Sequence, residues 1–165
     1  MPPMPTASEI IALLQLEPLP VEGGWFRRSY TSALALPDGR PAGTAIYFLI
    51  TPEGFSALHA LRTEEVWHFY AGDPVEHLTL DPATHTGAKT LLGSDVGRGQ
   101  RPQLVVPGGV WQGARLAPDT AREGWALIGC TMSPGWDAAE FTLGDRTALT
   151  ARFAGWAGDI YTLTR

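Results

Sequence analysis

The stretch that decides the fold of this chain runs from Gly54 to Gly72 and reads Gly-Phe-Ser-Ala-Leu-His-Ala-Leu-Arg-Thr-Glu-Glu-Val-Trp-His-Phe-Tyr-Ala-Gly. It predicts two β-strands joined by a polar turn over residues 62–64. Side chains alternate between the two faces of a strand, so a hairpin would bring His59 and Glu65 together on one face, flanked by aromatic residues. An imidazole beside a carboxylate in such a place is either the floor of a pocket or a buried polar pair in a core.

The composition indicates one globular, all-β domain. The chain has 165 residues, of which 44% are hydrophobic and 18% are charged, and a chain of this length can bury a substantial core. Its 19 glycines and 14 prolines exceed the usual share, and they favour many short strands and turns over long helices. We therefore expect a single domain over residues 1–165, with its core at about 8–150.

The charge balance and the N-terminal sequence exclude some partners. Twelve Lys and Arg residues against 17 Asp and Glu residues give a net charge of −5, and no basic run follows, so nucleic acid is not an expected partner. Ile10–Leu14 is too short to span a membrane, and no basic segment typical of a signal peptide precedes it. The expected location is the cytoplasm. The single cysteine, Cys130, lies in an apolar run and is expected to be a small buried residue.

Short strands with turn signals every 8–12 residues or so dominate the rest of the chain, which is typical of a β-sandwich or barrel. Thr6 and Glu9 match a capping box, so a short N-terminal helix is expected to follow and to end before Pro18. A second, weaker helix is expected over 147–153, followed by an irregular end. The other expected strands cover 25–31, 44–51, 75–80, 89–92, 103–106, 110–116, 125–132 and 141–143. A double-sheet jelly roll fits this pattern best.

Two groups of residues resemble the two sequence motifs of the cupins. The first motif has a glycine, two histidines one residue apart, a glutamate and a second glycine. Gly54, His59, Glu65 and Gly72 stand at similar spacings, with Leu61 in place of the second histidine. The second motif is a Pro-x-Gly turn followed three residues later by a histidine. Here Pro107-Gly-Gly109 is followed by Gln112 at that position.

Flanking segments make the resemblance more specific. They read Leu19-Pro-Val-Glu-Gly-Gly-Trp-Phe26, Glu65-Val-Trp-His-Phe-Tyr-Ala-Gly72, Val106-Pro-Gly-Gly-Val-Trp-Gln112 and Gly129-Cys-Thr-Met-Ser-Pro-Gly135. Together they are similar to the fifth cupin subfamily, a branch labelled by its domain of unknown function. The resemblance implies a cupin double-stranded β-helix, that is, an RmlC-like jelly roll with a short N-terminal helix. It supplies no reaction.

A metal site is the weaker of two functional interpretations. In metal-binding cupins the motifs supply three histidines and a glutamate, a set that suits first-row metals. The corresponding residues here are His59, Leu61, Glu65 and Gln112, and leucine donates nothing while a glutamine oxygen replaces imidazole poorly. His68 is expected on the opposite face of its strand from Glu65. No cofactor is therefore expected; if a divalent metal is bound, His59, Glu65 and Gln112 are its predicted ligands.

The second interpretation is a ligand pocket that works without a metal. Resemblance in barrel shape to the dTDP-sugar epimerases implies proton abstraction by a histidine paired with a carboxylate. His59 is then the expected base, Glu65 its partner, and Tyr47 or Tyr70 the acid. The expected substrate-binding residues are Gln112 for orientation, Trp25, Trp67 and Trp111 for stacking, His68, and Arg27 or Arg28 for an anionic group.

Two further classes stay open from the sequence. A metal-dependent, oxygenase-like cupin is one, and a non-catalytic binding or storage-like protein is the other. Aromatic residues at alternate strand positions also fill barrels without binding anything, and His59 with Glu65 can be a satisfied core pair. His77 is expected to be a surface strand residue and His85 a loop residue. Exposed sheet edges and the apolar N-terminal region favour a homodimer. The other expected partner is a small-molecule ligand.

Overall fold

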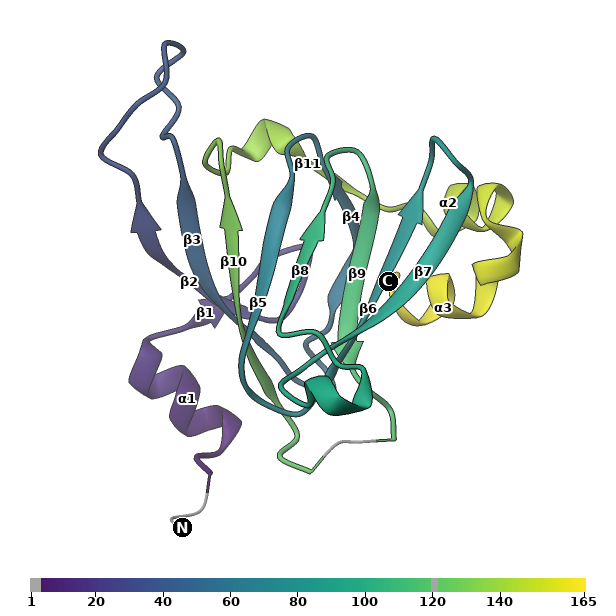
Figure 1. Cartoon of the computed structure of the whole chain (residues 1–165), viewed down its shortest axis with the longest axis horizontal. Helices are drawn as coiled ribbons and strands as arrows, with labels where there is room; N and C mark the ends of the chain where they lie inside the picture. The colour runs from purple at the N-terminus through teal and green to yellow at the C-terminus, as the bar shows by residue number, and fades with distance from the viewer. Residues whose placement is uncertain (1–3, 120–121) are drawn as a thin grey trace.

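The computed structural model describes residues 4–119 and 122–165 and forms two facing antiparallel β-sheets (Figure 1). The six-stranded sheet has the order β1 (Glu17–Pro18), β2 (Trp25–Thr31), β3 (Thr44–Ile50), β10 (Ala126–Met132), β5 (Glu65–Gly72) and β8 (Gln103–Val106). The five-stranded sheet has the order β11 (Phe141–Leu143), β4 (Ser56–Leu61), β9 (Trp111–Leu116), β6 (Val75–Asp81) and β7 (Thr86–Leu92). This architecture confirms the predicted jelly roll with a short N-terminal helix.

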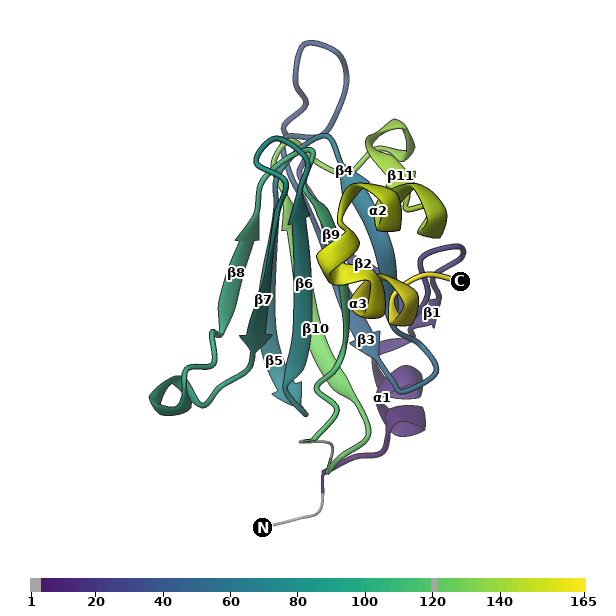
Figure 2. The ribbon, with the colours of Figure 1, turned by 90° about the vertical axis from the view of Figure 1, so that its right-hand side faces the viewer.

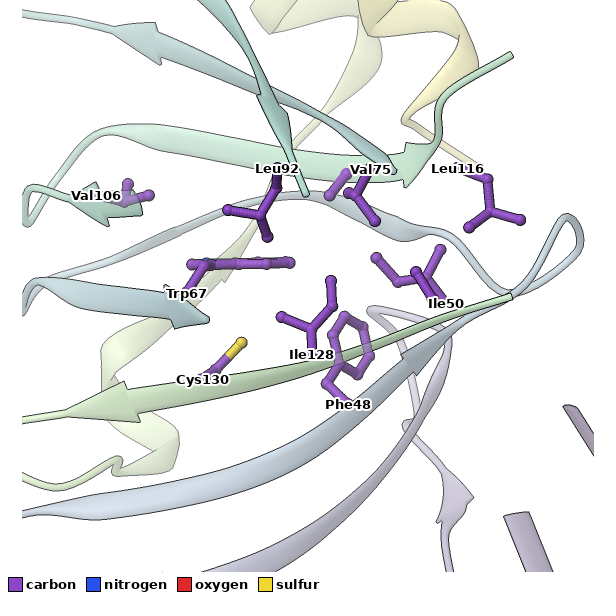
Figure 3. Packing of buried hydrophobic residues seen from close by; sticks show 11 residues of the cluster. Phe48, Ile50, Trp67, Val75, Leu92, Val106, Leu116, Ile128 and Cys130 are labelled. Carbon is purple, nitrogen blue, oxygen red and sulfur yellow. The ribbon is translucent and has the colours of Figure 1, made fainter. Parts of the chain in front are cut away.

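Alternating side chains from both sheets fill the space between them. Phe48 and Ile50 of β3 and Ile128 and Cys130 of β10 point inward from one sheet, and the ring of Trp67 lies among them (Figure 3). Residues on the facing strands close the core from the other side: Val75, Leu92, Ala114 and Leu116. Because strand side chains alternate, the residues next to these in sequence point outward, which decides which polar groups reach the interior.

The predicted hairpin of β4 with β5 is wrong. β4 lies between β11 and β9, whereas β5 lies between β10 and β8 in the other sheet. The turn at 62–64 therefore carries the chain from one sheet to the other. Five of the six residues of β4 are buried, so this strand has no solvent-facing side and is packed on both faces. His59 and Glu65 consequently approach the interior from different sheets and not side by side.

The N-terminal helix α1 (Ala7–Leu14) covers the outer face of the six-stranded sheet. Thr6 and Glu9 form the predicted capping box: the Thr6 side chain accepts from the Glu9 amide, and the Glu9 carboxylate accepts from the Thr6 amide at 2.7 Å. Ile10 is buried in a cluster with Leu49 of β3 and with Trp125, the residue directly before β10. The helix thus stabilises the sheet from outside and leaves its inner face free.

Two C-terminal helices, α2 (Arg146–Arg152) and α3 (Ala157–Thr162), cover the outer face of the five-stranded sheet (Figure 2). Leu149 and Phe153 pack on Leu58 of β4 and on Leu78 and Leu80 of β6. The expected irregular end after 153 is therefore wrong, because apolar residues at helical spacing bury themselves against the sheet. None of the helices in the described ranges is long and apolar enough to cross a membrane.

Candidate functional site

A cavity of about 490 Å³ lies between the two sheets. Its polar lining residues are Glu22, Arg28, Thr44, His59 and Glu65. The rest of the lining is apolar: Leu19, Pro20, Val21, Phe26, Ile46, Phe48, Leu61, Trp67, Cys130, Met132, Trp136, Ala138 and Phe141. An apolar cavity of this size with a few convergent polar groups has the character of a small-molecule site.

His59 is held in one orientation on β4. Its ring is buried and lies nearly parallel to the ring of Phe141, with 5.2 Å between the ring centroids. Nδ1 lies 2.8 Å from the carbonyl oxygen of Ala57. A carbonyl oxygen can only accept a hydrogen bond, so Nδ1 carries a proton. In the neutral ring the lone pair is then on Nε2, which is the nitrogen left to act on a ligand.

The carboxylate within ion-pair distance of His59 belongs to Glu22, a residue that the sequence analysis did not single out. Its Oε1 lies 3.9 Å from His59 Nδ1 and accepts a hydrogen bond of 2.7 Å from the Ser56 hydroxyl. Glu22 stands in a loop before β2, between two prolines and two glycines. The sequence did offer one signal, a charged residue inside an otherwise apolar and glycine-rich motif. It did not show that this residue contacts a strand more than thirty residues away.

Glu65 is held by a buried hydrogen-bond network. Its Oε2 accepts from Trp67 Nε1 at 3.0 Å and from Gln112 Nε2 at 2.9 Å. Burial raises the pKa of Glu65 to about 7, the charge of Glu22 adds to this increase, and His59 and the two hydrogen bonds oppose it. With both donors on Oε2, the other carboxyl oxygen is the one left for a ligand. Glu65 therefore exchanges a proton near neutral pH.

The network extends to His77, and the expectation that His77 is a surface residue is wrong. His77 is fully buried on β6, with its ring edge-on to Trp67 at 4.7 Å between centroids. Its Nε2 lies 3.3 Å from Gln112 Oε1, which also accepts from Trp67 at 2.9 Å. Burial lowers the pKa of His77 to about 3, so the ring is neutral at physiological pH. Together these contacts fix the amide of Gln112. His85 lies in the exposed turn after β6, as expected.

Several predicted site residues lie outside the cavity. Tyr47 and Trp25 point to the outer face of the six-stranded sheet and pack in the cluster under α1. Trp111 packs beneath the C-terminal helices. His68 also faces outward, with contacts to Thr131 Oγ1 at 3.0 Å and to Gln103 Nε2 at 3.2 Å. Strand alternation explains each placement, because the inward neighbours are Phe48, Phe26, Gln112 and Trp67.

The two adjacent arginines of β2 separate as alternation requires. Arg27, expected to bind an anionic group, faces outward and donates to the carbonyl oxygen of Leu14 at 3.1 Å. Arg28 lines the cavity, and its guanidinium lies over the ring of Trp136, 5.6 Å from the centroid. The cavity therefore brings together His59, Glu65 and Trp67 of the predicted set, with Gln112 bonded to the last two.

The donor set does not fit the metal of the metal-binding cupins. Leu61 has no donor atom, His68 faces away, and the amide of Gln112 is fully engaged by Trp67, Glu65 and His77. Within residues 4–119 and 122–165, no three His, Cys, Asp or Glu side chains are grouped so that they could hold a metal ion.

Comparison with known proteins identifies the family. The family model described as Cupin superfamily (DUF985) matches residues 8–144, and the chain belongs to this family. A solved structure of a hypothetical protein from Leishmania major is 32% identical, with 97% of this chain and 99% of that chain covered and a TM-score of 0.88. A protein from Shewanella oneidensis is 33% identical, with 98% and 99% covered and a TM-score of 0.90.

More distant likeness extends to the wider cupin fold. Oxalate decarboxylase from Bacillus subtilis, in a mutant form, is 15% identical, with 91% of this chain and 38% of that chain covered and a TM-score of 0.56. This likeness shows the shared fold alone. No curated protein matches the sequence. The particular activity must therefore be argued from the cavity.

Proposed function

We propose that this cupin-fold protein binds a small polar or sugar-like metabolite in its barrel and interconverts it by metal-free proton transfer of the isomerase or epimerase type. The observation that carries the proposal is the approach of His59 and Glu65 to one apolar cavity from different sheets. An imidazole and a carboxyl group on two walls of a cavity suit removal of a proton from one face of a carbon and its return to the other.

The proposed step balances with these two side chains. Nε2 of His59 takes the proton from a carbon next to a carbonyl group, and the electron pair of the broken C–H bond remains in the resulting enolate. The carboxylic acid of Glu65 then forms the new C–H bond on the opposite face. His59 ends protonated and Glu65 ionised, and exchange with solvent resets both. In this scheme Glu65 takes the role of acid that the sequence analysis gave to Tyr47 or Tyr70, and Glu22 takes the role of carboxylate partner to His59 that it gave to Glu65.

Deuterium incorporation tests this chemistry directly. Nucleotide sugars and cyclic keto or hydroxy metabolites are screened for binding by thermal shift, and compounds that bind are incubated with the protein in D₂O and followed by NMR. We expect deuterium at one stereocentre, with the rate reduced by 10²–10⁴-fold in His59→Ala and in Glu65→Gln while the fold is retained. Binding without deuterium incorporation would instead support the non-catalytic binding protein. Full activity in His59→Ala would remove His59 from the mechanism.

The protein is further proposed to form a homodimer. Two features support this: the edge strand β8, on which Val105 is 51% exposed, and helix α1, on which Leu13 is 76% exposed. Unpaired strand edges and exposed apolar side chains are common elements of subunit interfaces. Sedimentation equilibrium of the wild type and of Leu13→Glu and Val105→Glu variants tests it. A dimer that at least one charge disrupts is the expected result, and a monomeric wild type would contradict it.

A further inference from the structure

One row of side chains crosses the inner face of the six-stranded sheet and lines the cavity. Arg28 pairs in register with Ile46, Ile46 with Cys130, and Cys130 with Trp67. All four side chains line the cavity. The row starts at Arg28 on β2 and ends beside the hydrogen-bond network of Glu65 on β5. The cavity thus has a cation along one side, an apolar floor, and acid–base groups along the other side.

The guanidinium of Arg28 has no acidic partner within the part of the chain that the structure describes. Its contact is the ring of Trp136, which also lines the cavity. Some other arginines do have an acidic partner: Arg40 binds Glu140 at 2.8 Å, and Arg115 binds Glu76 at 2.9 Å. An unpaired guanidinium that is stacked on an aromatic ring, and so held in place, is a strong recognition group for a phosphate or carboxylate.

Glu22, Glu65 and His59 are the other acidic and basic side chains that line the cavity. The two carboxyl groups accept hydrogen bonds from a ligand, and the cavity between them and Arg28 is lined by aromatic and aliphatic groups. The three strand spacings from β2 to β5 amount to about 14 Å along the sheet. The row of side chains thus runs from the β2 end, where Arg28 stands, to the β5 end, where Glu65 stands.

We infer that the ligand of this cavity is a ring compound with an acidic substituent, bound with its phosphate or carboxylate at Arg28 and its hydrogen-bond donors at Glu22 and Glu65. The inference rests on the proposed function only in taking this cavity as the ligand site. It narrows the substrate class from polar metabolites in general to cyclic anions. The apolar floor formed by Ile46, Cys130 and Trp67 then contacts the ring.

Arg27 provides the matched control for a binding experiment. The probes are phenyl phosphate and benzoate, each compared by calorimetry with its neutral counterpart, phenol and benzyl alcohol. In the wild type we expect the anions to bind at least tenfold more tightly. Arg28→Gln should remove this preference, Arg28→Lys should restore part of it, and Arg27→Gln should keep it, because Arg27 lies on the same strand but faces outward.

The outcomes separate this inference from the proposed chemistry. An equal preference for anions in Arg28→Gln and the wild type would overturn it, as would the absence of saturable binding of both anionic probes to the wild type. Thermal unfolding of each variant confirms that the fold is intact. Anion binding that depends on Arg28, combined with no deuterium incorporation in any bound compound, would support the ligand class while contradicting the isomerase proposal.

Discussion

The two acid–base groups of the cavity are supported in different ways. On one side, Glu65 is held by Trp67, Gln112 and His77, all of them buried and all on strands of the barrel. On the other side, the carboxylate next to His59 comes from a loop. That loop is bonded to Ser56 and Ala57 of β4 but also depends on the exposed side chain of Arg165, so the environment of His59 rests in part on a weaker region of the structure than that of Glu65.

Hydrogen bonds from Arg165 help to hold the Glu22 loop in place. Its guanidinium donates to the carbonyl oxygens of Glu22 at 2.6 Å, Phe55 at 3.1 Å and Val21 at 3.3 Å. The backbone of Gly23 has a φ of +100°, and a Cβ there would also collide with the backbone carbonyl oxygen of Phe55, which explains the glycine. The barrel strands therefore position Glu65 directly. The surroundings of His59 also depend on the Glu22 loop and on Arg165, which come together only after folding.

The largest loss of stability is expected from breaking the buried hydrogen-bond network around Glu65. Gln112→Leu removes the amide that bonds Glu65, Trp67 and His77, and leaving these buried groups without partners should lower the free energy of unfolding by about 4 kcal/mol. Urea denaturation measures it. Gln103→Leu is the matched control, because that glutamine is exposed on β8, and its effect should stay within about 0.5 kcal/mol. Similar losses of unfolding free energy in both variants would show that the hydrogen-bond network of Gln112 does not stabilise the fold.

The next effect concerns the pH dependence of stability. The pKa of Glu65 rises from 4.5 to about 7 on folding, so the folded chain binds this proton more tightly than the unfolded chain does. Stability from this group is therefore full below about pH 4.5 and is lost as the pH rises to about 7, a change of roughly 3 kcal/mol. Urea denaturation at pH 5 and pH 8 should show a smaller decrease in Glu65→Gln than in the wild type. An identical decrease in both would contradict the raised pKa.

A smaller effect is expected from releasing the Glu22 loop. Arg165→Ala removes hydrogen bonds of an exposed side chain and should cost only about 1 kcal/mol of stability. It should nevertheless accelerate hydrogen exchange at Ala57, whose amide donates to Glu22 at 2.9 Å, and weaken ligand binding. Arg152→Ala, which removes an exposed arginine bonded to Pro82 elsewhere, is the control. Unchanged exchange at Ala57 in Arg165→Ala would show that Arg165 does not hold the loop.

No effect at all is expected from removing metal. The donor set around His59 and Glu65 does not match that of the metal-binding cupins, so chelation with EDTA should leave thermal stability and ligand binding unchanged. Elemental analysis of protein purified without a metal-affinity tag checks the same point. A near-stoichiometric metal that disappears in His59→Ala would reverse this conclusion and favour an oxygen-dependent enzyme.

Local patterns in the sequence were sufficient for the fold. Alternating strands, regular turn signals and the capping box of Thr6 and Glu9 depend on residues close together in the chain, and these predictions are confirmed. The motif positions of His59, Glu65 and Gln112 were found through the resemblance of these segments to the two cupin motifs. Because inward and outward positions alternate, the sequence further indicated that Arg27 and Arg28 face opposite sides, although not which of them faces the cavity.

Only the tertiary structure decided how these residues meet. Whether a turn pairs two strands or carries the chain to the facing sheet depends on partners far along the chain, so the hairpin of His59 and Glu65 could not be distinguished from the observed crossing. The burial of His77 and the approach of Glu22 to His59 likewise depend on the packing of distant strands and loops. The sequence by itself determined a cupin barrel with acid–base residues inside it. The pairing of those residues was decided by long-range contacts, which no local pattern encodes.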